Sequence, residues 1–233
     1  FSESKRVKVD DSAKNPADTF DALKLNLVRD FQTGIYDYNT MVSTFVRSAN
    51  FEPVKVSFTS AEWCGHVYEE LVFRPEGVSG RVLSYFENES SAGDVEHPKG
   101  GVAEDNLFIL LRGLRGDYLK PGGRRRVPFL ASAFHRRLTH APLRWSSAEI
   151  ERLPGALVVT VPAGKFAAGV YIVRTAEGRE GRFWIERAYP HRVLKWTWTP
   201  AAKLASRMGA DGADQGVLAG SARLSYWELN KNG

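Results

Sequence analysis

The 233-residue sequence has almost no cysteine and no long hydrophobic run. Its one cysteine is Cys64, which excludes an internal disulfide bond and any zinc site that needs several cysteine ligands. No apolar run approaches the ~20 residues that a helix needs to span a bilayer. We therefore expect no membrane-spanning helix. The sequence also contains no internal repeat and no low-complexity tract.

An excess of charge of one sign is also largely missing. The net charge is +5 and the pI is about 9.3, which mildly favours anionic partners but is too small to indicate nucleic-acid binding. We predict no nucleic-acid partner. Hydrophobic residues at 43% and charged residues at 25% are typical of a soluble globular protein. The six tryptophans favour a sheet-rich core, because large rings fit half-buried pleated surfaces.

The length fits one large β-rich domain, which can bury a full core without disulfides or metals. Residues 1–16 are polar and charged, and we predict a flexible N-terminal arm there. We predict that residues 17–233 form a single β-rich domain. The chain begins at Phe1 rather than at methionine. We expect an upstream segment, and a removed signal peptide would explain its absence.

Alternating β-forming runs follow one another at intervals of roughly ten residues, a spacing typical of an all-β sheet or barrel. The segment 17–29 fits either a short helix or the start of a strand over 23–31. Apolar spacing predicts one clear helix over 104–114. We expect loops over 87–101 and over 200–221, the latter with one helical turn at 201–208. The predicted strands are 35–46, 54–59, 67–74, 78–86, 126–134, 138–145, 157–161, 170–175, 182–188, 193–199 and 223–229.

The fold class predicted from this pattern is mainly β. We expect a large curved antiparallel sheet or half-barrel with one or two short helices.

The stretch Val54–Tyr68 concentrates the most chemistry, because it holds Glu62, Cys64 and His66 in an alternating pattern. If the backbone stays extended, these three side chains share one face of a strand. A carboxylate, a thiolate and an imidazole would then be available to a zinc ion. The objection is that residues two apart lie ~7 Å apart along a strand, so three ligands in a row must bend around one ion.

Two other interpretations of this stretch stay open. His66 would activate Cys64 as a nucleophile, with Glu62 as the orienting group. Alternatively, Cys64 is a small buried hydrophobe, Trp63 belongs to the core, and Glu62 or His66 satisfies backbone groups near Gly65. The bulky flanking residues favour the last interpretation. We therefore predict a buried, inert Cys64, with no metal and no cofactor bound.

Two further groups of side chains are candidates for ligand binding. If the predicted strands 126–134 and 138–145 form a hairpin, a basic cluster gathers at one end, where it would bind anionic groups of lipid or simply form a solvated charged edge. The second group is a set of aromatic residues that would either line an apolar groove or form the core: Phe183, Trp184, Tyr189, Trp196, Trp198, Tyr226 and Trp227. Within it, Trp196 and Trp198 are two residues apart and share a face of one strand. The basic cluster consists of Lys120, Arg124, Arg125, Arg126, Arg136, Arg137 and Arg144. The residues predicted to bind ligand are Trp63, Trp184, Trp196, Trp198, Arg124, Arg125 and Arg126.

Several segments carry a family resemblance. They are DFQTGIYDYN (30–39), SAEWCGH (60–66), NLFILLRGL (106–114), PAGKFAAGVYIV (162–173), FWIERAYPHRVLKW (183–196) and GSARLSYWELN (220–230). Together they resemble uncharacterised bacterial envelope proteins, often lipoproteins, some of them labelled septum-formation inhibitors. The second half also resembles periplasmic domains of unknown function that are thought to form a curved antiparallel sheet related to lipoprotein carriers. The resemblance implies a location in the periplasm or cell envelope, with a lipid anchor on the missing N-terminal segment as one option.

The function predicted from these observations is that of a non-enzymatic envelope protein. It would bind an apolar or amphipathic ligand, such as a lipid, or an envelope protein partner on a curved sheet. One alternative is a Cys/His-dependent hydrolase or a metal-dependent enzyme that uses Glu62, Cys64 and His66. A second alternative is a structural subunit of a surface assembly.

Overall fold

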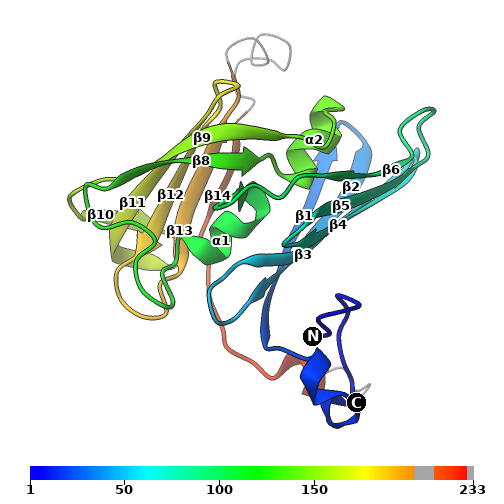
Figure 1. Cartoon of the computed structure of the whole chain (residues 1–233). Coiled ribbons are helices and arrows are strands. Elements are labelled where there is room, and N and C mark those ends of the chain that lie inside the picture. The colour runs from blue at the N-terminus through cyan, green and yellow to red at the C-terminus, as the bar shows by residue number, and fades with distance from the viewer. Residues whose placement is uncertain (202–212, 230–233) are drawn as a thin grey trace. The chain divides into compact units, whose positions relative to one another are not determined.

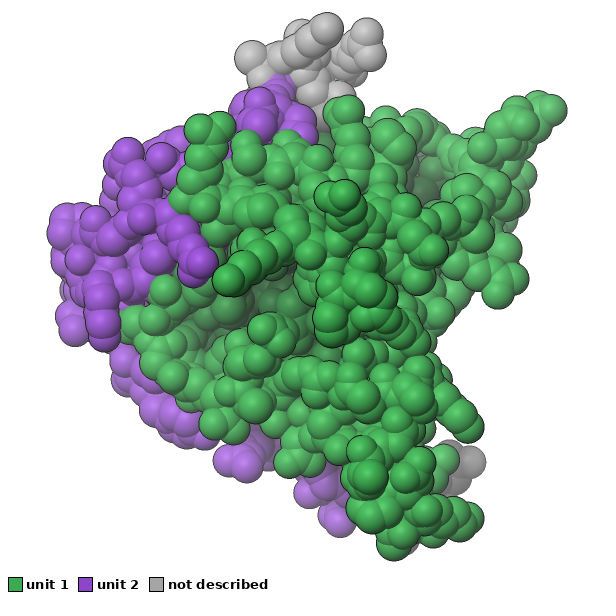
Figure 2. Space-filling model, in the orientation of Figure 1, with its two compact units in different colours: residues 1–118, 126–148 green, residues 119–125, 149–233 purple. Residues whose placement is uncertain are grey.

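The computed structural model describes residues 1–201 and 213–229. Strands account for 51% and helices for 11%, which confirms the mainly β prediction. The chain divides into two compact units (Figure 2). Unit 1 comprises Phe1–Tyr118 and Arg126–Ala148, and unit 2 comprises Leu119–Arg125 and Glu149–Gly233. No helix among the described residues has the length and apolarity needed to cross a membrane.

Unit 1 contains a six-stranded antiparallel sheet in which consecutive strands are neighbours (Figure 1). Because each strand reverses direction, the β1–β2, β3–β4 and β5–β6 connections lie at one end of the sheet. The segment 17–29 that fitted either a helix or a strand leads into a strand, and the predicted loop 87–101 contains a strand of its own. The strands are β1 (Ala22–Thr33), β2 (Tyr36–Arg47), β3 (Pro53–Glu62), β4 (Gly65–Arg74), β5 (Gly77–Ser84) and β6 (Ser91–Val95).

The core of unit 1 lies on one face of this sheet. In β3, Val54, Val56 and Phe58 are each about 1% exposed and alternate with partly exposed residues, as a half-buried strand requires. Ala133 and Phe134 of a short helix belong to the same buried cluster. The covering elements are β7 (Val102–Ala103), η3 (Glu104–Asn106), α1 (Leu107–Leu110), β8 (Arg124–Leu130) and α2 (Ala133–Thr139).

Two predictions in this region need correction. The helix predicted over 104–114 is a 3₁₀ turn followed by α1, which ends at Leu110. The predicted strand 126–134 stops at Leu130, and the predicted strand 138–145 does not form. The reason is α2: the Ser132 hydroxyl accepts a hydrogen bond from the His135 N–H (3.0 Å) and caps a helix that begins at Ala133.

The strands of unit 2 belong to an eight-stranded sheet with the order β14-β13-β12-β11-β9-β8-β7, and β10 pairs with β11 beside this path. The pairs β10–β11, β11–β12, β12–β13 and β13–β14 are antiparallel, and β7 pairs with β8 in parallel. Strands β8 and β9 carry residues of both units. The predicted strand 223–229 is wrong, because Tyr226–Glu228 form a 3₁₀ turn, η4. A strand occupies part of the predicted loop 200–221, and residues 202–208 of the predicted helical turn lie outside the described residues. The strands are β9 (Trp145–Arg152), β10 (Leu157–Val161), β11 (Gly164–Thr175), β12 (Glu180–Glu186), β13 (Val193–Thr199) and β14 (Asp214–Val217).

The N-terminal residues, expected as a flexible arm, make specific contacts in unit 1. They contain the short turns η1 (Ser12–Lys14) and η2 (Pro16–Asp18). The amino group of Phe1 donates to the Phe20 carbonyl at 2.9 Å, and the Ser2 hydroxyl donates to an Asp18 carboxylate oxygen at 2.7 Å. The Phe1 ring lies 5.0 Å from the ring of Phe45 on β2. These contacts tie the segment to the edge of the sheet.

Candidate functional site

The stretch that drew attention in the sequence forms a tight hairpin turn. Glu62 pairs with Gly65 across β3 and β4, so Trp63 and Cys64 form the two-residue connection. A Cβ atom at Gly65 would lie 2.6 Å from the ring of Tyr85, and its φ of +153° also favours glycine. The expectation that Glu62, Cys64 and His66 follow one another along an extended strand is therefore wrong.

The hairpin separates the three groups proposed for chemistry. Residues directly opposite each other across an antiparallel pair share a face. His66 pairs with Ala61, so it lies on the face opposite to that of Glu62, and His66 is exposed. Within the described residues, no group of three or more His, Cys, Asp or Glu side chains is arranged to hold a metal ion. Glu62 and His66 therefore do not share a face with each other.

Cys64 and Trp63 are exposed, which contradicts the prediction of a buried cysteine beside a core tryptophan. Cys64 is a free, exposed thiol, and Trp63 is 60% exposed. Both residues occupy the turn itself, where side chains project beyond the end of the sheet. The bulk of the flanking residues was therefore a poor guide to burial.

Glu62 connects three elements of unit 1. The Tyr85 hydroxyl donates to its Oε1 at 2.7 Å, and Nη2 of Arg137 on α2 lies 3.0 Å from the same oxygen. Burial, followed by the hydrogen bond to Glu62, raises the pKa of Tyr85 to about 12. The tyrosine therefore remains a donor at neutral pH. Glu62 is a link between the β3–β4 turn, the β5–β6 loop and α2.

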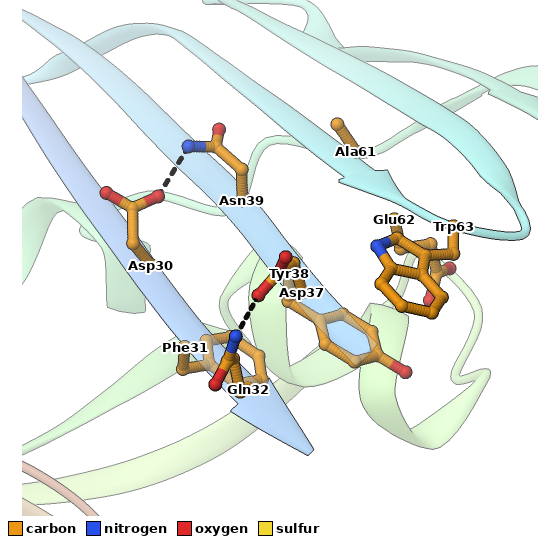
Figure 3. Close-up of a pocket in the computed structure, with 9 residues that line it drawn as sticks. All are labelled: Asp30, Phe31, Gln32, Asp37, Tyr38, Asn39, Ala61, Glu62 and Trp63. Carbon is orange, nitrogen blue, oxygen red and sulfur yellow. Dashed lines mark hydrogen bonds between the residues drawn. The ribbon is translucent and has the colours of Figure 1, made fainter. Parts of the chain in front are cut away.

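An open pocket of about 570 Å³ lies where β1, β2 and β3 meet the β3–β4 turn. Figure 3 shows the Trp63 indole projecting from this turn toward the end of β2. The pocket belongs entirely to unit 1. Its lining residues are Asp30, Phe31, Gln32, Asp37, Tyr38, Asn39, Ala61, Glu62 and Trp63.

Aromatic rings lie beside this pocket. The Phe31 and Tyr38 rings stack with a centroid separation of 5.0 Å across the β1–β2 pair, on the face of the sheet opposite to that of Asp30 and Asp37, because neighbouring residues of a strand alternate between faces. The Trp63 ring lies 5.1 Å from the ring of Tyr36, so the first and second hairpins touch through their turns. An exposed indole held by a neighbouring ring is a preformed surface for an apolar group.

Acidic and amide side chains form the polar part. The Asn39 amide donates to Asp30, and the Gln32 amide donates to Asp37 (Figure 3). No Lys, Arg or His lines the pocket. Because Glu62 already faces Arg137, the carboxylates left to attract a ligand are those of Asp30 and Asp37.

Sequence reasoning missed these acidic residues as site residues, although it singled out the segment 30–39. Asp30 and Gln32 precede the two-residue turn Gly34–Ile35, and Asn39 and Asp37 follow it at matching distances. A hairpin register centred between Gly34 and Ile35 would have predicted both pairs. Of the predicted ligand-binding residues, Trp63 alone lines this pocket.

The predicted basic cluster does not gather at one end of a hairpin, because α2 replaces its second strand. Arg124 lies 3.6 Å from Glu149 and 3.3 Å from Glu151 within unit 2. Arg125 and Arg126 are exposed. In unit 1, Arg136 pairs with Glu69 and Arg137 pairs with Glu62. Arg124, Arg136 and Arg137 thus serve separate ion pairs.

The tryptophans of the predicted aromatic groove do not all share one face. Phe183 pairs with Trp196, so Trp184 lies on the face of the sheet opposite to that of Trp196 and Trp198. Trp198 is 5% exposed. Its ring covers Gly181 on the neighbouring strand, and the ring of Trp196 covers Gly216 in the same way. Trp198 packs in the core of unit 2.

Gly181→Ala is expected to lower the free energy of unfolding by about 1–3 kcal/mol, the usual cost of overpacking a filled core. The reason is that a Cβ atom at this position would lie 2.8 Å from the Trp198 ring. Urea unfolding followed by tryptophan fluorescence measures the change. Gly155→Ala in the same unit is the control, because a Cβ atom there meets nothing within 4 Å. Equal stability of the two variants would contradict this packing.

Comparisons with known proteins assign no family to this chain. No protein-family model matches the chain, and no curated protein matches it. One solved structure is similar, a DUF1089 family protein from Pseudomonas aeruginosa, with 12% sequence identity and a TM-score of 0.42. The match covers 73% of this chain and 87% of that chain. A TM-score this low does not establish a shared fold, and no property of that protein is transferred to this one.

Proposed function

We propose that this chain is a non-catalytic binding protein whose pocket at the β3–β4 turn takes an amphipathic ligand with a cationic head. The observation that carries the proposal is the exposed Trp63 indole beside an open pocket that also presents Asp30 and Asp37. Aromatic faces attract quaternary ammonium and similar cations. Carboxylates add an electrostatic preference for the same ligands.

A small ligand suits this pocket better than a flat protein surface does. The pocket is hollow, with a volume of about 570 Å³, inside the range of small-molecule sites. Its polar side chains point in fixed directions because each carboxylate is held by an amide on the paired strand. Preorganised polar groups around an apolar wall fix the orientation of a small ligand.

A location in the periplasm or cell envelope, with or without a lipid anchor, also remains a proposal. It rests on the family resemblance of the segments quoted above. Cell fractionation of the full-length gene product tests it. Recovery in the cytoplasmic fraction alone would remove this part of the proposal and leave the binding site untouched.

Trp63→Ala is expected to weaken the binding of phenyltrimethylammonium about tenfold. One cation–π contact contributes about 0.5–2 kcal/mol, and a tenfold change corresponds to about 1.4 kcal/mol. Isothermal titration calorimetry measures the affinity. Trp227→Ala is the matched control, because Trp227 is 63% exposed but does not line the pocket. Equal weakening in both variants would contradict the proposed site.

The charge of the ligand is tested with benzenesulfonate, which has a similar ring and the opposite charge. We expect it to bind much more weakly than phenyltrimethylammonium. Asp37→Asn should reduce this preference, because one carboxylate of the pocket loses its charge. A wild-type protein that binds both compounds equally would overturn the cationic part of the proposal.

A further inference from the structure

A second cavity of unit 1, of about 300 Å³, lies apart from the pocket at the β3–β4 turn. It is formed by residues of β3, β4 and β5, of the β5–β6 loop and the start of β6, of α2 and of the loop that follows α2. The two sets of lining residues share no member. Its volume is at the lower end of the ~300–1,000 Å³ that ligand pockets span, so any occupant is small.

The floor of this cavity is apolar. Phe58 and Val67 are 1% and 4% exposed, and Val82 and Leu143 complete the floor. Leu143 reaches the sheet because Gly80 carries no side chain: a Cβ atom there would lie 2.6 Å from the leucine Cδ2. The loop after α2 is thereby held against β5, and the apolar floor is preformed.

Two arginines line the cavity, and they differ in how many of their guanidinium N–H groups have a partner. Arg136 is 4% exposed; it pairs with Glu69 and also donates to the Ala131 carbonyl at 3.0 Å. Arg137 lies 3.0 Å from Glu62, but its contact with Glu89 is long, at 3.9 Å. Its Nε is buried and has no hydrogen-bond partner. A buried donor left unpaired typically costs about 1–3 kcal/mol.

The surroundings hold the Arg137 guanidinium in place. Its centre lies 4.7 Å from the centroid of the Phe86 ring, an arrangement that leaves the edge of the guanidinium plane available for hydrogen bonds. Glu89, which also lines the cavity, accepts from the Ser84 hydroxyl at 2.8 Å and lies 2.5 Å from Nδ1 of His140. These two donors, rather than Arg137, hold the Glu89 carboxylate. An anionic ligand in the cavity therefore meets a positioned guanidinium whose one close acidic partner among the described residues is Glu62.

We infer that this cavity is a second ligand site, which binds a small carboxylate with an apolar body. The carboxylate accepts from Arg137, whose guanidinium edge matches the geometry of a carboxylate, and the body lies on Phe58, Val67 and Val82. Glu69 does not repel the ligand strongly, because Arg136 neutralises it. This inference does not rest on the proposed function, since it uses another cavity and a ligand of opposite charge.

The test is calorimetric titration of the full chain with 3-phenylpropanoate and with its neutral analogue 3-phenylpropanamide. We expect the acid to bind in the millimolar range or tighter, and the amide at least tenfold more weakly. Arg137→Gln should abolish the difference between the two compounds. Arg125→Gln is the control, because it removes one exposed arginine that does not line the cavity.

A second variant keeps the inference testable if Arg137→Gln fails to fold. Val82→Phe enlarges a partly buried side chain of the floor, and we expect it to weaken binding of the acid at least tenfold. Trp63→Ala should leave that binding unchanged, which separates this site from the first. Equal affinity for acid and amide, no binding of the acid to the wild type, or full binding by Val82→Phe would each overturn the inference.

Discussion

Arg136→Met is expected to lower the free energy of unfolding by about 3–5 kcal/mol, the usual cost of breaking a buried ion pair by removing one partner. Arg136 is 4% exposed and its partner Glu69 is 7% exposed. Without the guanidinium, Glu69 must either remain charged in an apolar environment or take up a proton. Urea unfolding at neutral pH measures the loss.

Two controls identify the cause of this loss. Burial already raises the pKa of Glu69, against the opposing effect of Arg136. The variant should therefore be less destabilised in acid, where Glu69 is protonated and neutral. The double variant Arg136→Met with Glu69→Leu should recover most of the stability, because both charges are replaced by apolar groups. A double variant as unstable as the single one would show that the ion pair is not the origin.

Asp105 is expected to make stability depend on pH in the opposite direction from a carboxylate whose pKa is lowered by an ion pair. Asp105 is buried, and burial raises the pKa of its side chain from 3.8 to about 6, although the Ala133 N–H donates to it at 3.0 Å. Between about pH 4 and 6 the folded protein then holds a proton that the unfolded chain releases. The free energy of unfolding therefore falls as the pH rises through this window, by about 3 kcal/mol at 1.36 kcal/mol per pKa unit.

Asp105→Asn should flatten this part of the pH profile. The asparagine keeps an oxygen that accepts from the Ala133 N–H, but it carries no charge to desolvate. At neutral pH the variant should be more stable than the wild type, by as much as about 3 kcal/mol. Urea unfolding at a series of pH values between 4 and 7 provides the measurement. Parallel profiles for variant and wild type would mean that another group controls the dependence.

The sheet could be predicted from the sequence where alternation was strong. Val54, Val56 and Phe58 alternate with polar residues, and the strand they predicted is β3. The helix α2 was missed, although Ser132 is a good helix cap, because the β-forming residues around it favoured a strand. The local pattern shows whether a segment favours a strand or a helix by itself. It does not show which of the two structures forms once the segment packs against neighbouring elements.

The candidate site was harder to predict because it depends on register. Trp63 was predicted as a ligand-binding residue and lines the pocket at the β3–β4 turn. The turn reverses the chain immediately after Glu62, however, and sends His66 to the other face. Neither Trp63 nor Cys64 is a typical turn residue. The acidic residues of the pocket come from both arms of another hairpin. Their proximity follows from strand pairing, which single residues do not reveal.

The most direct test of the proposed function is the response of the six tryptophan indole N–H signals to phenyltrimethylammonium in a ¹H–¹⁵N NMR titration. The Trp63→Phe variant assigns the signal of Trp63. We predict that this signal shifts in a saturable manner while those of Trp184, Trp196 and Trp198 stay in place. No saturable shift of the Trp63 signal, or equal shifts of all the indole signals, would contradict the proposed binding site.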